Sequence, residues 1–227
     1  MLNLACAVEG SDIILDFIAG SGTTAQAVLE LNRQDGGNRK FILVQLPEPT
    51  GRDDYPTIAD ITKERVRRVI KKLDDEDAGR LDLSGGQVQD RGFRVFKLAE
   101  SNFTPWNADV PRDTASLAEQ LAMHVDHIRE GRAADDLLYE ILLKSGFSLT
   151  TPVESRELAG VTVHSVDNGA LFVCLERNLT MEVIRAMADR RPERVVCLDE
   201  SFAGNDQLKA NAVQIFKTKG VPSFKTV

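Results

Sequence analysis

The sequence predicts an α/β protein in which two small α/β units flank a pair of helices. Apolar runs of strand length alternate with helix-period patterns near both ends of the 227-residue chain. Between them lie two helix-period patterns without an intervening strand. We therefore expect an α/β domain over residues 1–100, a linker over 101–112, a helical segment over 113–150 and a small α/β domain over 151–227.

Composition places the chain among soluble globular proteins. Hydrophobic residues make up 42% and charged residues 28% of it, and no apolar run approaches the ~18 residues that span a bilayer, so no membrane contact is expected. The net charge of −7 disfavours this chain alone as a nucleic-acid clamp, because phosphate binding needs a basic surface. Cys6, Cys174 and Cys197 are widely spaced, which predicts reduced thiols and a cytoplasmic location.

The first unit is predicted from two strands and two helices. Residues 12–17 and 40–46 are continuous apolar runs, typical of parallel strands that are covered on both faces. Helix-period patterns predict helices over 23–32 and 57–73. The acidic residues 74–77 are expected to end the second helix in a charged turn.

The middle of the chain is predicted to contain one strand, the linker and two helices. The alternating run FRVFKL predicts a third strand over 93–98. After the irregular residues 101–112, apolar stripes predict helices over 114–130 and 133–144. The second helix is closed by the C-cap signal Ser145-Gly146.

The last unit alternates strands and helices again. Residues 161–166 and 170–176 are expected to form a hairpin through the turn Asp167-Asn168-Gly169, whose residue types favour such turns. The remaining elements are predicted as helix 180–190, strand 194–199, helix 206–218 and strand 223–227.

A glycine-rich turn between the first strand and the first helix is the candidate binding site. The run ILDFIAGSGTT, residues 14–24, leads into a turn that presents backbone N–H groups at the positive end of a helix. No lysine follows the glycines, which excludes the Walker A phosphate loop. Gly20-x-Gly22-x-x-Ala25 formally fits a dinucleotide loop.

Asp16, just before this turn, indicates the charge of the ligand. Its carboxylate would repel a pyrophosphate and attract an ammonium group. S-adenosylmethionine carries an ammonium and a sulfonium group, so Asp16 with the turn suits S-adenosylmethionine better than NAD. Gln45 ends the second strand, where contact with the ribose is expected. An NAD-dependent protein and a tight turn that binds nothing are the alternatives.

The same residues resemble a known family. Asp16 to Thr24 is similar to the S-adenosylmethionine motif of amino-group DNA methyltransferases. Further runs, AVLELNRQDGGNRKFILVQLPEP, TIADITKERVRRVIKK, GFRVFKL and SNFTPWN, resemble the C-terminal part of the modification subunit of type III restriction-modification systems, which are beta-class adenine-specific DNA methyltransferases. The resemblance covers most of the chain.

The resemblance implies a partial Rossmann-like sheet of an S-adenosylmethionine-dependent methyltransferase. Members transfer a methyl group from S-adenosylmethionine to the exocyclic amine of an adenine flipped out of DNA. Asp16 would hold the methionine end, and Gln45 would bind the ribose without the charge assistance of an acid. The implied cofactor-binding residues are Asp16, Phe17, Ala19, Gly20, Ser21, Gly22, Thr23, Thr24 and Gln45.

The sequence departs from the family pattern in two ways. Ile18 stands where the F-x-G-x-G pattern has phenylalanine. The catalytic D-P-P-Y type motif is missing: the sequence contains no Pro-Pro, and only 15 residues precede Asp16. The target-recognition region is also missing, so we expect a fragment without catalytic residues that is inactive alone.

DNA is an expected partner of the complete enzyme, and a second copy and the restriction subunit are expected partners too. The alternative is a non-catalytic assembly module.

Three other features are assessed from the sequence. His124 and His127 form an H-x-x-H pair without a third ligand, so no metal site is expected. The basic residues within 63–72 could meet DNA phosphates, but the acidic run after them partly cancels their field, which favours a solvated helix face. In the family that the sequence resembles, the strand over 12–17 is central and its other neighbour would come from the missing part. The resemblance therefore implies an unpaired apolar edge, and the chain is expected to associate.

Overall fold

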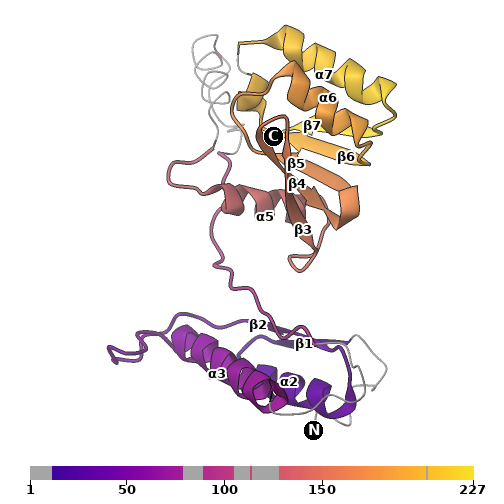
Figure 1. Ribbon diagram of the computed structural model, residues 1–227. Coiled ribbons are helices and arrows are strands. Elements are labelled where there is room, and N and C mark those ends of the chain that lie inside the picture. Colours follow the sequence, from indigo (N-terminus) through magenta and orange to yellow (C-terminus); the bar gives the residue numbers. More distant parts are fainter. Residues whose placement is uncertain (1–11, 79–88, 105–112, 114–127, 203) are drawn as a thin grey trace. The chain divides into compact units, whose positions relative to one another are not determined.

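The computed structural model describes residues 12–78, 89–104, 113, 128–202 and 204–227 (Figure 1). The chain divides into two compact units between Val95 and Phe96. Both units are mixed α/β and each has its own apolar core. The predicted linker over 101–112 lies largely outside the described residues. No helix in the described part is both long and apolar enough to cross a membrane.

The first unit contains a two-stranded parallel sheet and two helices. The elements are, in chain order, β1 (Ile13–Asp16), α2 (Thr23–Asp35), β2 (Lys40–Leu43) and α3 (Ile58–Ala78). Both helices pack on the same face of the sheet (Figure 1), where Leu29 of α2 and Val66 of α3 meet Phe41 and Leu43 of β2. The two strands and two helices predicted for this unit are confirmed, with shorter strands than expected.

A capping box fixes the start of α3. The Asp60 backbone N–H donates to Thr57 Oγ1 at 3.2 Å, and the Thr57 N–H and hydroxyl donate to the Asp60 carboxylate at 3.1 and 2.7 Å. Lys63 adds a salt bridge to Asp60 at 2.7 Å. The hydrogen bonds from Lys63 and Thr57 lower the pKa of Asp60 to about 2, so this cap is ionised at neutral pH.

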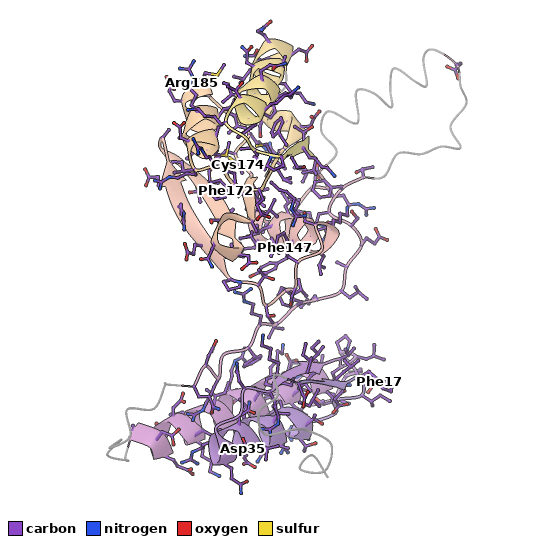
Figure 2. All side chains as sticks on the ribbon, turned by 90° about the vertical axis from the view of Figure 1, so that its right-hand side faces the viewer. Phe17, Asp35, Phe147, Phe172, Cys174 and Arg185 are labelled. Atoms are coloured by element: carbon purple, nitrogen blue, oxygen red, sulfur yellow. The ribbon has the colours of Figure 1, made fainter. Side chains whose placement is uncertain are left out.

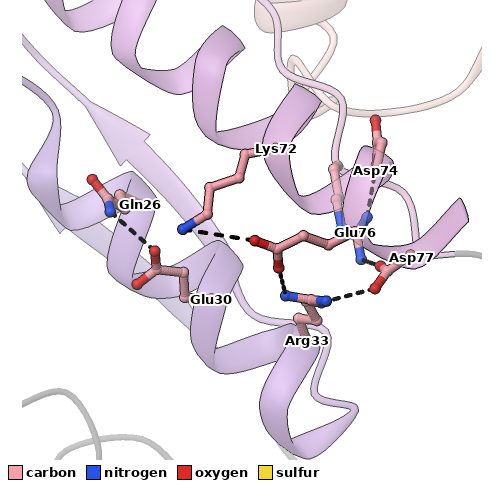
Figure 3. A network of polar contacts seen from close by, with 8 residues as sticks. Gln26, Glu30, Arg33, Lys72, Asp74, Glu76 and Asp77 are labelled. Carbon is pink, nitrogen blue, oxygen red and sulfur yellow. Dashed lines mark hydrogen bonds and ion pairs between the residues drawn. The ribbon is translucent and has the colours of Figure 1, made fainter. Parts of the chain in front are cut away.

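The end of α3 corrects a prediction. The acidic run 74–77 was expected to terminate the helix, yet the helix continues to Ala78. Four acids at a helix C-terminus are unfavourable because that end carries negative partial charge. Two arginines offset this: Arg33 of α2 and Arg91 both bind Asp77, and each also binds a second carboxylate of the run (Figure 3). With part of its negative charge offset in this way, the run can remain helical.

The strand predicted over 93–98 is also wrong. The segment has no strand pairing in the structure. Phe93 contributes to the core of the first unit and lies 6.0 Å from the Arg67 guanidinium. Phe96 instead packs edge-on against Tyr139 of the second unit, with ring centroids 4.9 Å apart. The apolar alternation therefore arises because Phe93 and Phe96 each pack in a different unit, and not because the segment forms a strand.

The second unit is built on a five-stranded sheet. The strands are, in spatial order, β3 (Val153–Leu158), β4 (Val161–Val166), β5 (Leu171–Cys174), β6 (Arg194–Cys197) and β7 (Ser223–Thr226). The first three are antiparallel, and β5, β6 and β7 are parallel. The predicted hairpin between β4 and β5 is confirmed, with a 3-10 turn over Asp167–Gly169.

Helices cover both faces of this sheet. The helix α5 (Ala134–Lys144) packs on one face, and α6 (Met181–Asp189) and α7 (Asp206–Thr218) pack on the other (Figure 1). The wholly buried strand β5 shows the division: Val173 packs in the core with α5, whereas Phe172 packs in the core with α6 and α7. The helices predicted at these three positions are confirmed. The helix predicted over 114–130 lies outside the described residues up to position 127.

The edge strand β3 has no counterpart among the predicted strands. It joins β4 through Ala159 and Gly160, both at positive φ, 51° and 80°. This is the conformation of a type I′ turn, which asparagine or aspartate followed by glycine normally signals. The strand residues VESREL are mostly polar and exposed, so neither the turn nor the strand gives a clear sequence signal.

The two described cysteines are structural. Cys174 of β5 and Cys197 of β6 are partners in the parallel register, and both are completely buried and free. Burial raises the pKa of both thiols, which disfavours the reactive thiolate. The predictions for Cys6, His124 and His127 lie outside the described residues.

Replacing Arg91 by Ala should destabilise the end of α3 by about 2 kcal/mol, because hydrogen bonds to charged groups are lost at a side chain that is only 9% exposed. Hydrogen-exchange mass spectrometry of α3 measures the change. Arg52→Ala is the control, since its ion pair with Asp54 is exposed to solvent and should contribute little to stability. Equal effects of the two changes would contradict the importance of this network.

Candidate functional site

The candidate site lies where β1 and β2 end. Because the two strands are parallel, their carboxyl ends meet at the same edge of the sheet. The turn over residues 17–22 follows β1 at this edge and leads into α2, and Gln45 comes shortly after β2. The carboxyl edge of a parallel sheet is where open α/β proteins bind ligands. The structure therefore brings together the residues that the sequence proposed from two distant segments.

Asp16 is held in a fixed orientation at the end of β1. One carboxylate oxygen accepts a hydrogen bond from Thr24 Oγ1 at 2.5 Å, and the other accepts one from the Ile18 backbone N–H at 3.1 Å. Thr24 belongs to the first turn of α2, so this contact joins the strand to the helix across the glycine turn. A carboxylate has about four acceptor positions, and two are used here. Asp16 thus retains acceptor capacity on both oxygens.

Gln45 binds the turn itself. Its Oε1 accepts a hydrogen bond from the Gly20 N–H at 2.7 Å, and its Nε2 donates to the Leu46 carbonyl at 3.1 Å. The Ala19 N–H donates to the Val44 carbonyl at 3.2 Å. These bonds fasten the turn to the segment after β2. The contact between Gln45 and a ribose stays a prediction, and this side chain already orders the turn.

Both glycines of the turn adopt conformations that other residues rarely adopt. Gly20 has φ +54° and Gly22, the N-cap of α2, has φ +80°. Thr62 of α3 lies against both glycines. Its hydroxyl donates a hydrogen bond to the Gly20 carbonyl at 2.5 Å. Its methyl group leaves no room for a side chain on Gly22, because a Cβ there would lie only 3.0 Å from it. Sequence reasoning missed Thr62, because a threonine on the apolar stripe of a helix resembles an ordinary core residue.

The predicted residues line a small open hollow. Its volume is about 240 Å³, and it is lined by Leu15, Asp16, Phe17, Ile18 and Thr24. Ligand pockets usually have ~300–1,000 Å³, so this hollow is a partial site. Phe17 is 72% exposed and projects outward from the first unit (Figure 2). A second hollow, of about 330 Å³, lies between the loop after β2 and α3 and contains none of the predicted residues.

One face of the sheet is apolar and exposed. On β1 and β2, alternate residues turn away from α2 and α3, and Leu15 and Ile42 are register partners that are 59% and 50% exposed. We call this the open sheet face, and its residues are Ile13, Leu15, Phe17, Ile42, Val44 and Leu46. Within the described residues, β1 pairs only with β2. Parallel sheets normally have both faces covered, and large exposed apolar patches mark interaction sites.

The described residues offer no metal site. They contain no group of three or more histidine, cysteine, aspartate or glutamate side chains that could hold a metal ion. The chemistry available at the carboxyl edge is therefore a fixed carboxylate, a glycine turn and exposed apolar side chains.

Comparison with known proteins identifies homologues over most of the chain. The Mod subunit of the type III restriction-modification enzyme EcoP15I from Escherichia coli is 32% identical over 93% of this chain. The EcoPI Mod subunit from Escherichia phage P1 is 33% identical over 85% of it. The type II methyltransferase M.KpnI from Klebsiella pneumoniae is 40% identical over 31% of the chain and 18% of its own length. No family model matches the chain.

These homologues are much longer than the chain, which spans 31% of the EcoP15I subunit and 28% of the EcoPI subunit. The expected resemblance to type III modification subunits is therefore confirmed as a homology to about a third of such a subunit. The similarity to a methyltransferase fits the mixed α/β fold.

Gly22→Ala should cost more stability than Gly20→Ala, although both place alanine at positive φ. The strain at each is about 1–2 kcal/mol, but only Gly22 lies against the Thr62 methyl group. Urea unfolding of the single and double variants measures the difference. Adding Thr62→Ser to Gly22→Ala should recover roughly the excess cost, since it removes the methyl and keeps the hydroxyl. No recovery would contradict the contact.

The open sheet face should make the chain associate. Size-exclusion chromatography with light scattering should show oligomers. Leu15→Thr with Ile42→Thr should shift the distribution toward monomer, and threonine is a β-branched residue that suits a strand. The control replaces exposed apolar residues of the second unit, Leu143→Thr with Val213→Thr. A monodisperse monomer of the unchanged chain would contradict the expectation.

Proposed function

We propose that this chain, a homologue of about a third of the Mod subunits of type III restriction-modification enzymes, supplies the S-adenosylmethionine-binding part of an adenine-specific DNA methyltransferase. The observation that supports this most is the carboxyl edge of β1. There the oriented carboxylate of Asp16 lies beside a glycine turn that begins a helix. The similarity to a type II methyltransferase supports the same reaction class.

Asp16 would receive the methionine end of the cofactor. The Thr24 hydroxyl and the Ile18 N–H hold the carboxylate without using all its acceptor positions, so its oxygens can accept hydrogen bonds from an ammonium group. A charged acceptor makes such hydrogen bonds about twice as strong as neutral ones. The bound cofactor supplies an activated methyl group on its sulfonium. Asp16 would fix the position of that group by holding the other end of the molecule.

The glycine turn would enclose the cofactor through its backbone. Gly20 and Gly22 carry no side chain that could block a close approach, and Ser21, Thr23 and Thr24 add hydroxyl groups at the start of α2. Ala19 is buried and anchors the turn to the Val44 carbonyl. Phe17 and the neighbouring Ile18 would provide an apolar wall, with Ile18 in place of the family's aromatic ring.

The rest of the active site would come from another segment. The hollow beside Asp16 is smaller than usual ligand pockets, and the open sheet face needs a cover. The part of the longer relatives outside the matched region would provide both. The D-P-P-Y type motif and the base-reading residues would lie in that part, so this chain would contribute no catalytic residue and would be inactive alone. DNA and the restriction subunit would be partners of the complete enzyme.

A non-catalytic assembly module is the second candidate. It is favoured by the second unit, which has a sheet covered on both faces and contains none of the proposed cofactor residues. In that case the chain would hold a modification dimer or the restriction subunit together. Cofactor binding distinguishes the two functions, because assembly does not require it.

Isothermal titration with S-adenosylmethionine tests the proposal. The chain should bind the cofactor, and Asp16→Ala should weaken binding at least tenfold, about 1.4 kcal/mol. Asp12→Ala is the matched control, because Asp12 is an exposed acid just before the same strand, and it should change affinity less than twofold. Unchanged affinity in Asp16→Ala would refute the role of Asp16, and an absence of binding by the unchanged chain would favour assembly.

A further inference from the structure

The helix α3 carries a strongly basic exposed face. Residues 63–72 contain six basic side chains and one acid, although the whole chain has a net charge of −7. We call the exposed cations the basic face of α3: Arg67, Arg68, Lys71 and Lys72. Lys63 lies one turn before Arg67, so Lys63, Arg67 and Lys71 follow each other at four-residue spacing on one side of the helix.

The acids that follow the basic face offset its charge only in part. From the sequence, the run 74–77 was expected to cancel its field. In the structure, Arg33 and Arg91 bind three of these four acids from outside the basic face (Figure 3). The contact from the basic face to this run, between Lys72 Nζ and Glu76, is long at 3.9 Å. Two of the four negative charges of the run are therefore already compensated by cations that do not belong to the basic face.

Several cations of the basic face are available to a partner. Among the described residues, Arg67 and Lys71 form no ion pair. Arg67 lies over the Phe93 ring at 6.0 Å, a contact that leaves its guanidinium N–H groups unused. Arg68 pairs with Glu64 of its own helix at 2.7 Å and donates a hydrogen bond to the Tyr55 hydroxyl at 2.9 Å. Exposed ion pairs of this kind contribute little to stability.

We propose that the basic face of α3 binds the phosphate backbone of duplex DNA. The face has no large exposed apolar side chain, whereas protein interfaces depend on buried aromatic or aliphatic anchors. Phosphate contacts need only cations and carry no sequence information. This surface would therefore position DNA on the enzyme and would not read bases. The choice of DNA rests on the proposed function, but the surface contains no cofactor residue.

Fluorescence anisotropy with a labelled duplex of about 20 base pairs tests this proposal on the full chain. The unchanged chain should bind at about 50 mM salt and weaken as salt rises to about 200 mM. The variant Arg67→Gln, Lys71→Gln and Lys72→Gln should weaken binding roughly tenfold or more. The slope of the logarithm of its binding constant against the logarithm of the salt concentration should fall in magnitude by about 2 to 3, because each lost phosphate contact removes ~0.9 from this slope.

A charge-matched control separates this surface from net charge. The control changes Arg185, Arg190 and Lys217 to Gln, all exposed on the second unit; Arg185 is labelled in Figure 2. The log–log salt slope of this control should stay within about 0.5 of the slope of the unchanged chain. Circular dichroism should show equal helicity in both variants. Equal losses in both, or no DNA binding by the unchanged chain, would overturn the proposal. Equal displacement by poly-glutamate would overturn the assignment to DNA and favour an acidic protein. None of these outcomes depends on cofactor binding.

Discussion

The first unit depends on a two-stranded parallel sheet, and within the described residues of this unit only one face of that sheet is covered. Parallel strands are apolar on both sides because they normally lie between two layers, and here α2 and α3 supply one layer. On the open sheet face, Leu15 is 59% exposed and Ile42 is 50% exposed. This unit has a small core, and charged contacts add to it: Arg33 of α2 binds Glu76 and Asp77 of α3 and so joins the two helices.

The same constraint shapes the candidate site. Ligand sites of α/β proteins lie at the carboxyl edge of the sheet, and this edge is ordered by Thr62 from α3 and Gln45 from beyond β2. The turn is therefore held from the covered side by the unit's own residues. On the opposite side, Phe17 and the hollow beside Asp16 open outward. The described residues therefore form one side of the proposed site.

Local patterns predicted much of this arrangement, and long-range contacts account for the rest. The positions of Asp16 at the end of a strand and of Gly22 at the start of a helix could be predicted, because strand, glycine turn and helix are adjacent in the sequence. The role of Thr62 and the continuation of α3 to Ala78 could not, since each depends on residues tens of positions away, such as Arg33. The wrong strand over 93–98 has the same origin: its aromatic residues pack in two different units.

The division between Val95 and Phe96 has a thermodynamic consequence. The apolar cores of the two units share no residue among those described, so each unit can unfold as a cooperative block of its own. The first block has one covered sheet face and the second has two. A single melting temperature or unfolding free energy is then not a defined property of the chain. Each quantity belongs to one block, and a variant reports only on the block that contains it.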